Sequence, residues 1–254
     1  MNIQINKVSS SKELDQFINF PKYLYASDKN FIFEPFSMQK EFLSDKNYFF
    51  EHSGAEYFLA VSDNKIVGRI ASIRNNVHNR IYKERTGFFG LFESVDNYEV
   101  AELLFDKVKE IHKLSGFDKI SGPTNLTTND SCGMLVSGFD SPPVIMMPYN
   151  KEYYYDFLVR YGFAKETDLY SYYIGDEILT SPSFEKLANR ISKNLTACRI
   201  TFRKINYRML DHDIIQMRQV YNESNKSNWG FIPLTENEFS KTAHQFRQFV
   251  PDNL

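Results

Sequence analysis

The stretch "FFGLFESVDNYEVAELLF", residues 88–105, is the sequence feature that most constrains the fold. Its first part has the pattern of a buried strand, and its second part begins an amphipathic helix. A buried strand that runs directly into a helix is typical of α/β proteins, where the helix start often holds a phosphate. No glycine follows Gly90 here, and Glu93, Asp96 and Glu99 crowd the junction. The junction is therefore either a cofactor site or a helix that caps itself.

Hydrophobic periodicity and turn residues predict the elements on both sides of this junction. The predicted elements of the first part of the chain are a strand over residues 2–10, a helix over 9–25 that ends or bends at Pro21, a short helix and loop over 33–52, a hairpin over 56–75 that turns at Asp63 and Asn64, a loop over 76–87, the strand over 88–95, a helix over 97–116, a strand over 117–123, a long polar loop over 124–150, a helix over 151–163 and a strand over 164–174.

A second unit begins after this series. Residues 182–194, 212–225 and 235–249 have helical patterns, and residues 198–205 alternate as a strand does. We therefore expect one complete domain over residues 1–175, followed by an incomplete second domain over 176–254.

The composition narrows the function classes. The chain has 254 residues, a formal net charge of −2 and an isoelectric point near 6.2. Because its basic residues are spread along the chain, we expect neither a nucleic-acid partner nor a membrane partner. Two cysteines are too few for a disulfide framework or a zinc site, so no metal is expected. The small net charge favours a small molecule as the partner. The polar N-terminus lacks the pattern of a signal peptide, which predicts a cytoplasmic protein.

The order of elements resembles the GNAT acyltransferase fold, in which an antiparallel hairpin precedes a parallel strand-helix-strand core. The closing "YYYDFLVRYGFAKETDLY" is part of this resemblance. The segments "FINFPKYLY", "GRIASIRN", "FFGLFES", "SGPTNLTTNDSCGMLVSGFDSPP" and "NWGFIPLT" are similar to bacterial tandem GNAT-like proteins. This resemblance implies an α/β (α+β) fold with a mixed, twisted sheet flanked by helices, and a second GNAT-like unit. It also implies an N-acyltransferase, most simply an N-acetyltransferase, that uses acetyl-CoA or another acyl-CoA.

The resemblance places the coenzyme A pyrophosphate at the helix start, where backbone amides hold it in the family. The corresponding cofactor-binding residues are Phe92, Glu93, Ser94, Val95, Asn97 and Tyr98. The family's glycine-rich loop is absent here, and the local carboxylates would repel a diphosphate at a Debye length of about 8 Å. The alternative is a capping box in which Asp96 accepts from the amide of Glu99 and Glu99 reaches back, which stabilises the helix by roughly 1 kcal/mol.

Two residues are candidates for catalysis. Members of the family place a carboxylate base on or beside the strand that Glu93 ends, and Phe89 and Phe92 would raise its pKa by desolvation. The alternative is a solvated carboxylate at a helix start. The family's acid is a tyrosine at the position of Leu158, and Tyr154 lies one turn earlier on the same helical face. The alternative for Tyr154 is aromatic packing.

The loop over residues 122–143 is the candidate for substrate specificity. Its hydrogen-bonding side chains include the predicted substrate-binding residues Asn125, Thr127, Asn129 and Ser131. The alternative is a loop whose Asn and Asp side chains satisfy their own turns. Trp229, the single tryptophan, either contacts substrate or packs one domain on the other. Cys132 lacks the sequence spacing that would support a thiol nucleophile with a histidine base.

Two functions from different classes therefore stand. The first is an acyl-CoA-dependent N-acyltransferase that acts on a small amine. The second is a non-catalytic GNAT-like module that binds a small molecule or a protein and has lost the glycine-rich loop. A homodimer is a further prediction, because an incomplete sheet leaves an edge that a second copy can pair with.

Overall fold

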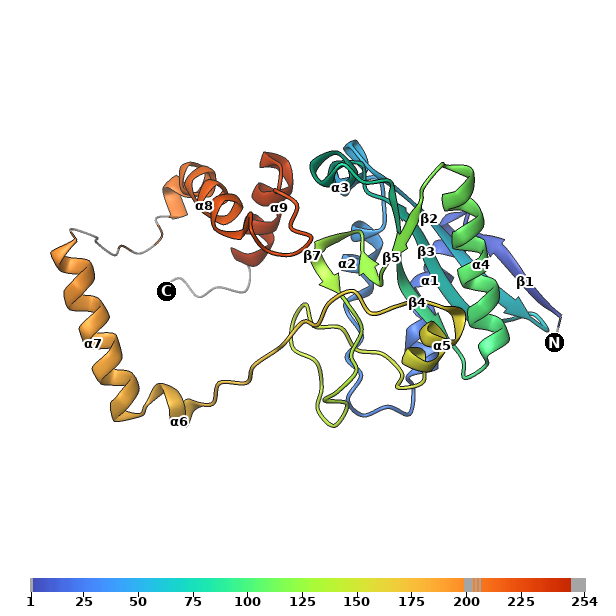
Figure 1. Ribbon diagram of the computed structural model, residues 1–254, viewed down its shortest axis with the longest axis horizontal. Helices are drawn as coiled ribbons and strands as arrows, with labels where there is room; N and C mark the ends of the chain where they lie inside the picture. The colour runs from blue at the N-terminus through green and yellow to red at the C-terminus, as the bar shows by residue number, and fades with distance from the viewer. Residues whose placement is uncertain (1, 199–202, 204, 206, 248–254) are drawn as a thin grey trace.

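A mixed five-stranded sheet forms the centre of the computed structural model, which describes residues 2–198, 203, 205 and 207–247 (Figure 1). The strands of this sheet are β1 (Ile3–Lys7), β2 (Gly54–Ser62), β3 (Lys65–Arg74), β4 (Thr86–Ser94) and β5 (Lys119–Ser121). They lie in chain order, antiparallel from β1 to β4, with β5 parallel to β4. The predicted α/β fold class, a mixed sheet flanked by helices, is confirmed, whereas the partial second unit stays a prediction.

Helices and a small second sheet complete the described chain. The helices are α1 (Ser11–Leu24), α2 (Phe36–Phe42), η1 (Tyr48–Glu51), α3 (Asn76–Tyr82), α4 (Tyr98–Leu114), α5 (Tyr154–Tyr161), α6 (Asp176–Leu179), α7 (Pro182–Ala197), η2 (Tyr207–Met209), α8 (Leu210–Asn225) and α9 (Glu236–Arg247). The second sheet pairs β6 (Thr124–Asn125) with β7 (Thr127–Cys132).

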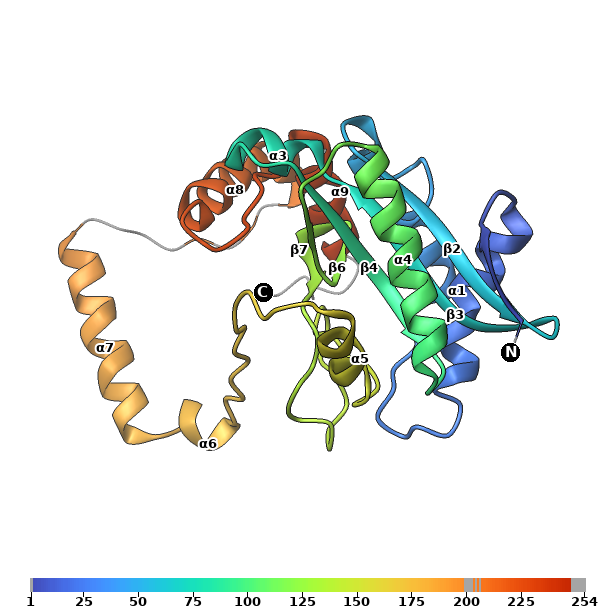
Figure 2. The same ribbon diagram turned by 45° about the vertical axis from the view of Figure 1, so that its right-hand side comes forward.

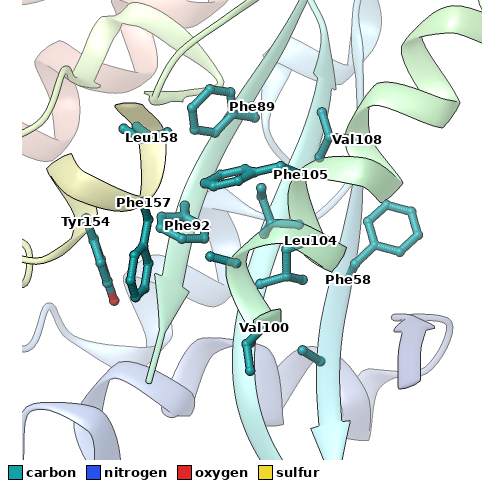
Figure 3. Packing of buried hydrophobic residues seen from close by; sticks show 13 residues of the cluster. Phe58, Phe89, Phe92, Val100, Leu104, Phe105, Val108, Tyr154, Phe157 and Leu158 are labelled. Atoms are coloured by element: carbon teal, nitrogen blue, oxygen red, sulfur yellow. The ribbon is translucent and has the colours of Figure 1, made fainter. Parts of the chain in front are cut away.

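Two apolar clusters hold the sheet between helices. On one face, the apolar stripe of α4 packs with α5 against β2, β3 and β4, and Figure 3 shows Leu104 and Phe105 beside Phe92. On the other face, Phe17 and Ile18 of α1 are fully buried against the sheet. Full burial of a leucine or phenylalanine side chain stabilises a fold by roughly 1.5–3 kcal/mol, so these stripes fix where α1 and α4 lie.

Local chemistry explains where several elements begin and turn. Ser10 and Glu13 form a reciprocal capping box at the start of α1. The β2–β3 hairpin turns at Asp63 and Asn64, which have φ of 50° and 61°, a left-handed conformation that Asp and Asn tolerate. The prediction for this hairpin is confirmed. Pro21 lies inside α1, which continues to its last residue Leu24.

Two predictions of secondary structure are wrong. Residues 76–82 form helix α3, because Asn75 accepts from the amide of His78 and caps it. Residues 164–174, predicted as a strand, have no strand assignment, and Tyr173 is 92% exposed. A strand needs a neighbour for its backbone groups, and in the described chain no other strand lies beside this segment.

The C-terminal helices are confirmed where the structure describes them. Helices α8 and α9 lie beside β7, whereas α6 and α7 lie away from the sheet (Figures 1 and 2). The strand predicted over residues 198–205 falls mostly outside the described residues, and the domain boundary near residue 175 stays a prediction. Within the described chain, no helix has both the length and the apolar character needed to cross a membrane.

Candidate active site

A β-bulge in β4 sets the direction of its last residues. The pairing of β3 with β4 shifts register between Arg69 and Ala71, and Leu91 takes a positive φ of 50° there. Beyond the bulge, Glu93 is the direct partner of Arg69. Directly opposed residues of an antiparallel pair have their side chains on one face, so the bulge brings the carboxylate beside the guanidinium.

The carboxylate of Glu93 is buried and shared by two tyrosines. Its Oε2 accepts hydrogen bonds from the hydroxyls of Tyr25 and Tyr154, each at 2.8 Å. Burial raises the pKa of Glu93 above its ordinary value, although Arg69 and the two hydroxyls oppose this shift. The predicted direction of the pKa shift is confirmed, and the alternative of a solvated carboxylate is wrong.

Tyr154 is fixed by backbone as well as by Glu93. Its hydroxyl accepts from the amide of Ser94 at 2.8 Å, and its ring packs on Phe92 with centroids 4.9 Å apart (Figure 3). Burial raises the pKa of Tyr154 well above its ordinary value, so the hydroxyl keeps its proton at neutral pH. The aromatic packing predicted as the alternative for Tyr154 is confirmed, and its role as a catalytic acid stays a prediction.

Arg69 is the buried cation of the site, and α1 supplies its acceptor. Its Nη1 donates to the carbonyl of Phe17 at 2.8 Å, and its Nη2 lies 3.8 Å from Oε1 of Glu93. In an unbroken helix the carbonyl of Phe17 would accept from the residue four positions later, which is Pro21 and has no N–H. We call Tyr25, Arg69, Glu93 and Tyr154 the Glu93 cluster.

Two loops meet beside Tyr25. Asp28, in the loop after α1, accepts from the Tyr149 hydroxyl at 2.9 Å and pairs with Lys151 at 3.3 Å. Asn30 of the same loop donates to the carbonyl of Phe139 at 3.0 Å. These contacts tie the loop over residues 25–35 to the loop over residues 133–153 at the edge of the Glu93 cluster.

The start of α4 is capped by a residue other than the predicted one. Asn97 is the N-cap, and its Oδ1 accepts from the amide of Glu99 at 3.0 Å. The predicted Asp96–Glu99 capping box is therefore wrong. Asn97 and not Asp96 caps the helix, because Asn97 lies immediately before the first helical residue and has the extended backbone of an N-cap, with φ −150° and ψ 111°.

Two of the amides predicted to hold a pyrophosphate already have protein acceptors. The amide of Ser94 donates to Tyr154, and the amide of Val95 donates to the carbonyl of Val67 at 2.9 Å. Phe92 lies in the core, and Tyr98 lies under the guanidinium of Arg160 with 3.7 Å from its Cζ to the ring centroid. Arg160 therefore places one positive charge beside the helix start.

The predicted specificity loop makes internal contacts and contacts β4. Oδ1 of Asn125 accepts from the amide of Leu91 at 3.1 Å. Thr127 donates through its amide and its hydroxyl to Asp130, at 3.1 and 2.9 Å. Ser131 is half-buried in β7. These contacts match the alternative of a loop that satisfies its own turns, and substrate binding by these residues stays a prediction.

Asn129 joins the same loop to the C-terminal helices. Its amide nitrogen Nδ2 donates to the carbonyl of Ile232 at 2.7 Å, and its Oδ1 accepts from the Tyr221 hydroxyl at 3.3 Å. Thr128 donates to the carbonyl of Gly230. The neighbouring Trp229 is 46% exposed. The loop thus contacts α8 and the segment that joins α8 to α9.

Burial makes Cys132 a poor candidate for a thiol nucleophile. Burial raises the pKa of Cys132 to about 11, which keeps it as a thiol at neutral pH. In the described part of the chain, no group of three or more His, Cys, Asp or Glu side chains is placed to hold a metal ion.

Sequence reasoning missed Tyr25, Asp28, Arg69 and Lys151. One signal could have found Arg69, because "KIVGRIASI" places a cation in the middle of an otherwise apolar strand. Tyr25 carries no comparable signal, since it follows a helix in an aromatic-rich stretch. Its role depends on where the end of α1 lies against β4.

Comparison with known proteins gives two curated relatives. No protein-family model matches the chain. Protein YghO of Escherichia coli (strain K12) is 34% identical over 246 residues, which are 96% of this chain and 62% of YghO. The Bacterial ceramide synthase of Caulobacter vibrioides (strain NA1000 / CB15N) is 29% identical over 255 residues, which are 100% of this chain and 65% of that protein. The chain thus spans less than two thirds of the length of either relative.

Solved structures with similar backbones are acetyltransferases. An aminoglycoside acetyltransferase from an uncultured soil metagenomic sample, in complex with sisomicin, is 18% identical with a TM-score of 0.43, covering 68% of this chain and 95% of its own. The ribosomal-protein-alanine N-acetyltransferase from Brucella melitensis biovar Abortus 2308 is 14% identical with a TM-score of 0.39, covering 68% of this chain and 99% of its own.

Proposed function

We propose that this chain, which has the mixed-sheet fold of the GNAT acyltransferases, is an N-acyltransferase that joins the acyl group of an acyl-CoA to a small-molecule amine. One observation carries the proposal: two tyrosine hydroxyls hold the buried carboxylate of Glu93 at the end of β4. A carboxylate whose pKa is raised by burial is suited to accept a proton from an amine during attack. The relative named Bacterial ceramide synthase supports the same class, because ceramide formation is the N-acylation of an amino alcohol.

The buried carboxylate of Glu93 suggests how the acyl transfer proceeds. The amine nitrogen attacks the thioester carbonyl, a C–N bond forms, and the C–S bond breaks. Glu93 accepts the proton that the nitrogen loses, and as a carboxylic acid it returns this proton to the departing thiolate. Tyr154 and Arg69 position Glu93 through their contacts with its carboxylate. We assign no proton transfer to Tyr154, because its raised pKa makes its hydroxyl a poor proton donor.

The acyl donor would bind without the glycine-rich loop whose backbone amides usually hold its diphosphate. The amides of Ser94 and Val95 are occupied, and Asp96 and Glu99 are exposed beside them. Arg160 is the cation nearest to the helix start in the contacts described above. We therefore expect weaker binding of the diphosphate than a glycine-rich loop provides, with acetyl-CoA or a longer acyl-CoA as the donor.

A non-catalytic binding module is the second candidate function. The occupied amides at the start of α4 favour it, because they remove donors that the family uses for coenzyme A. This candidate predicts that a small molecule binds without thioester cleavage. Whether two copies pair is a separate prediction, which size-exclusion chromatography checks.

Release of the coenzyme A thiol distinguishes these functions. The chain is mixed with acetyl-CoA or palmitoyl-CoA and either hexylamine or a long-chain 2-amino alcohol, and free thiol is followed with time. We expect amine-dependent release that Glu93→Gln reduces by about 100-fold or more, as loss of a general base does. Glu110→Gln, an exposed carboxylate of α4 well away from the helix start, is the matched control. Absence of both heat on titration and a shift in melting temperature with millimolar acyl-CoA would reject the transferase.

A further inference from the structure

Three aromatic side chains pack together next to Glu93. The ring of Phe31 stacks on Tyr25 with centroids 4.1 Å apart and planes 10° apart. The ring of Tyr149 lies 6.0 Å from Tyr25 and 6.1 Å from Phe31. Tyr25 is buried, whereas Phe31 and Tyr149 are half-buried. We call Tyr25, Phe31 and Tyr149 the aromatic cage.

The ammonium group of Lys151 already lies against one ring of this group, Tyr25. Nζ of Lys151 lies 4.3 Å from the centroid of Tyr25. Since Phe31 covers one face of that ring, the ammonium lies over the other face. The same Nζ is 3.3 Å from Oδ2 of Asp28, whose Oδ1 accepts from the hydroxyl of Tyr149. An aromatic face combined with a carboxylate is the chemistry that recognises a cationic nitrogen.

The cage is coupled to the carboxylate of the proposed reaction. The hydroxyl of Tyr25 donates to Oε2 of Glu93, so the ring that holds the cation also holds the base. The positive charge of Lys151 lowers the pKa of Glu93, against the larger effect of burial. A cation in the cage therefore favours the ionised form of Glu93, which is the form that accepts a proton.

We propose that the uncovered face of Tyr25 and the carboxylate of Asp28 bind the primary ammonium group of the acceptor substrate, which loses one proton to solvent before its nitrogen attacks, and that Lys151 fills this site when the acceptor is absent. This inference rests on the proposed function, because it identifies the acceptor site of that reaction. Lys151 is well placed to leave, since its side chain is 22% exposed and it belongs to the loop over residues 133–153.

An internal occupant weakens binding of an external one. If Lys151 fills the cage about nine tenths of the time, the apparent dissociation constant of an acceptor is raised about tenfold. Replacing Lys151 with a residue of similar length and no charge removes that competition. Methionine and glutamine both meet this condition, and they leave Asp28 free to pair with the acceptor.

Calorimetric titration with hexylammonium, without any acyl donor, tests the site. We expect Lys151→Met to bind hexylammonium about tenfold tighter than the unmodified chain does, and hexanol to bind neither. Asp28→Asn added to Lys151→Met should abolish the gain. Lys29→Met, an exposed lysine of the neighbouring loop, should leave the affinity unchanged.

Equal affinity of Lys151→Met and the unmodified chain would overturn the inference, as would equal binding of hexanol. Circular dichroism melts confirm that each variant is folded, and Lys151→Gln takes the place of Lys151→Met if the latter does not fold. The proposed function fails separately, because hexylammonium binding requires no thioester. Binding without thiol release would reject the transferase and keep the ammonium site.

Discussion

The backbone carbonyl of Phe17 accepts a hydrogen bond of 2.8 Å from the guanidinium of Arg69. This carbonyl is free for Arg69 because Pro21, four residues later in α1, has no N–H. A residue that weakens a helix thus supplies the acceptor for a buried cation, and that cation lies 3.8 Å from Glu93.

Replacement of Pro21 with alanine restores a competing helical donor. We expect Pro21→Ala to gain about 3 kcal/mol of helix propensity and to lose about 1.5–3 kcal/mol of charged hydrogen bond, which leaves a net gain of about 0 to 1.5 kcal/mol in the free energy of unfolding. Thiol release should fall, because Arg69 loses its anchor. Urea unfolding and the transfer assay check both results, with Lys22→Ala as the control. A large stability gain with full activity would contradict this account.

Removal of Arg69 leaves Glu93 buried without an opposing charge. We expect Arg69→Met to destabilise the fold by about 3–5 kcal/mol at neutral pH, which is typical when one partner of a buried pair is lost. The loss should shrink at acidic pH, where Glu93 is protonated. Arg69→Met combined with Glu93→Gln should recover stability. A double-mutant cycle by chemical unfolding measures this, and additive losses would argue against the pair.

Tyr154→Phe keeps the ring and removes the hydroxyl. The amide of Ser94 then loses its acceptor, and Glu93 loses one of its two tyrosine donors. We expect destabilisation of about 1–3 kcal/mol, the cost of an unsatisfied buried polar group. The pH profile of thiol release should shift to higher pH, because the pKa of Glu93 rises when a donor is removed. Tyr155→Phe, an exposed neighbour, should change neither measurement.

The raised pKa of Asp130 predicts that the stability of the fold depends on pH. Burial raises its pKa from 3.8 to about 7. A carboxyl with a raised pKa in the folded state contributes stability that is present below pH 4 and is lost as the pH rises through about 7. We expect Asp130→Asn to flatten the decline in melting temperature between pH 4 and 7, as scanning calorimetry would show. Asp140→Asn in the next loop is the control, and parallel curves for all three proteins would exclude the shift.

A substitution at Asn129 tests whether this residue has a structural role or binds substrate. Asn129→Ala removes the donor to the buried Ile232 carbonyl and should cost about 1–3 kcal/mol. Hydrogen exchange in α8 and α9 should then accelerate, since the loop loses its hold on these helices. If exchange is unchanged while KM for the amine rises, Asn129 binds substrate instead. Asn228→Ala, in the loop before Trp229, serves as the control.

Residue patterns predicted the elements that depend on local rules. The apolar stripe of α4, the turn at Asp63 and Asn64, and the helices α7 to α9 were all predictable, because each depends on neighbours within a few positions. The predicted helix cap failed at Asp96 because two adjacent polar residues compete for one position. The prediction of a strand over residues 164–174 was wrong, because alternation of apolar and polar residues indicates strand preference but does not show whether a neighbouring strand is present.

The candidate site divides in the same way. Glu93 and Tyr154 were identified one by one from the resemblance, and the aromatic neighbours of Glu93 predicted the direction of its pKa. The structure alone brings Tyr25 to Glu93 across 68 positions and Tyr154 across 61 positions. By itself, the sequence determined the strand, the helix and the carboxylate at their junction. Tertiary packing decided that this carboxylate is buried between two hydroxyls and a guanidinium, because hydrogen bonds between distant residues form only where packed elements bring them together.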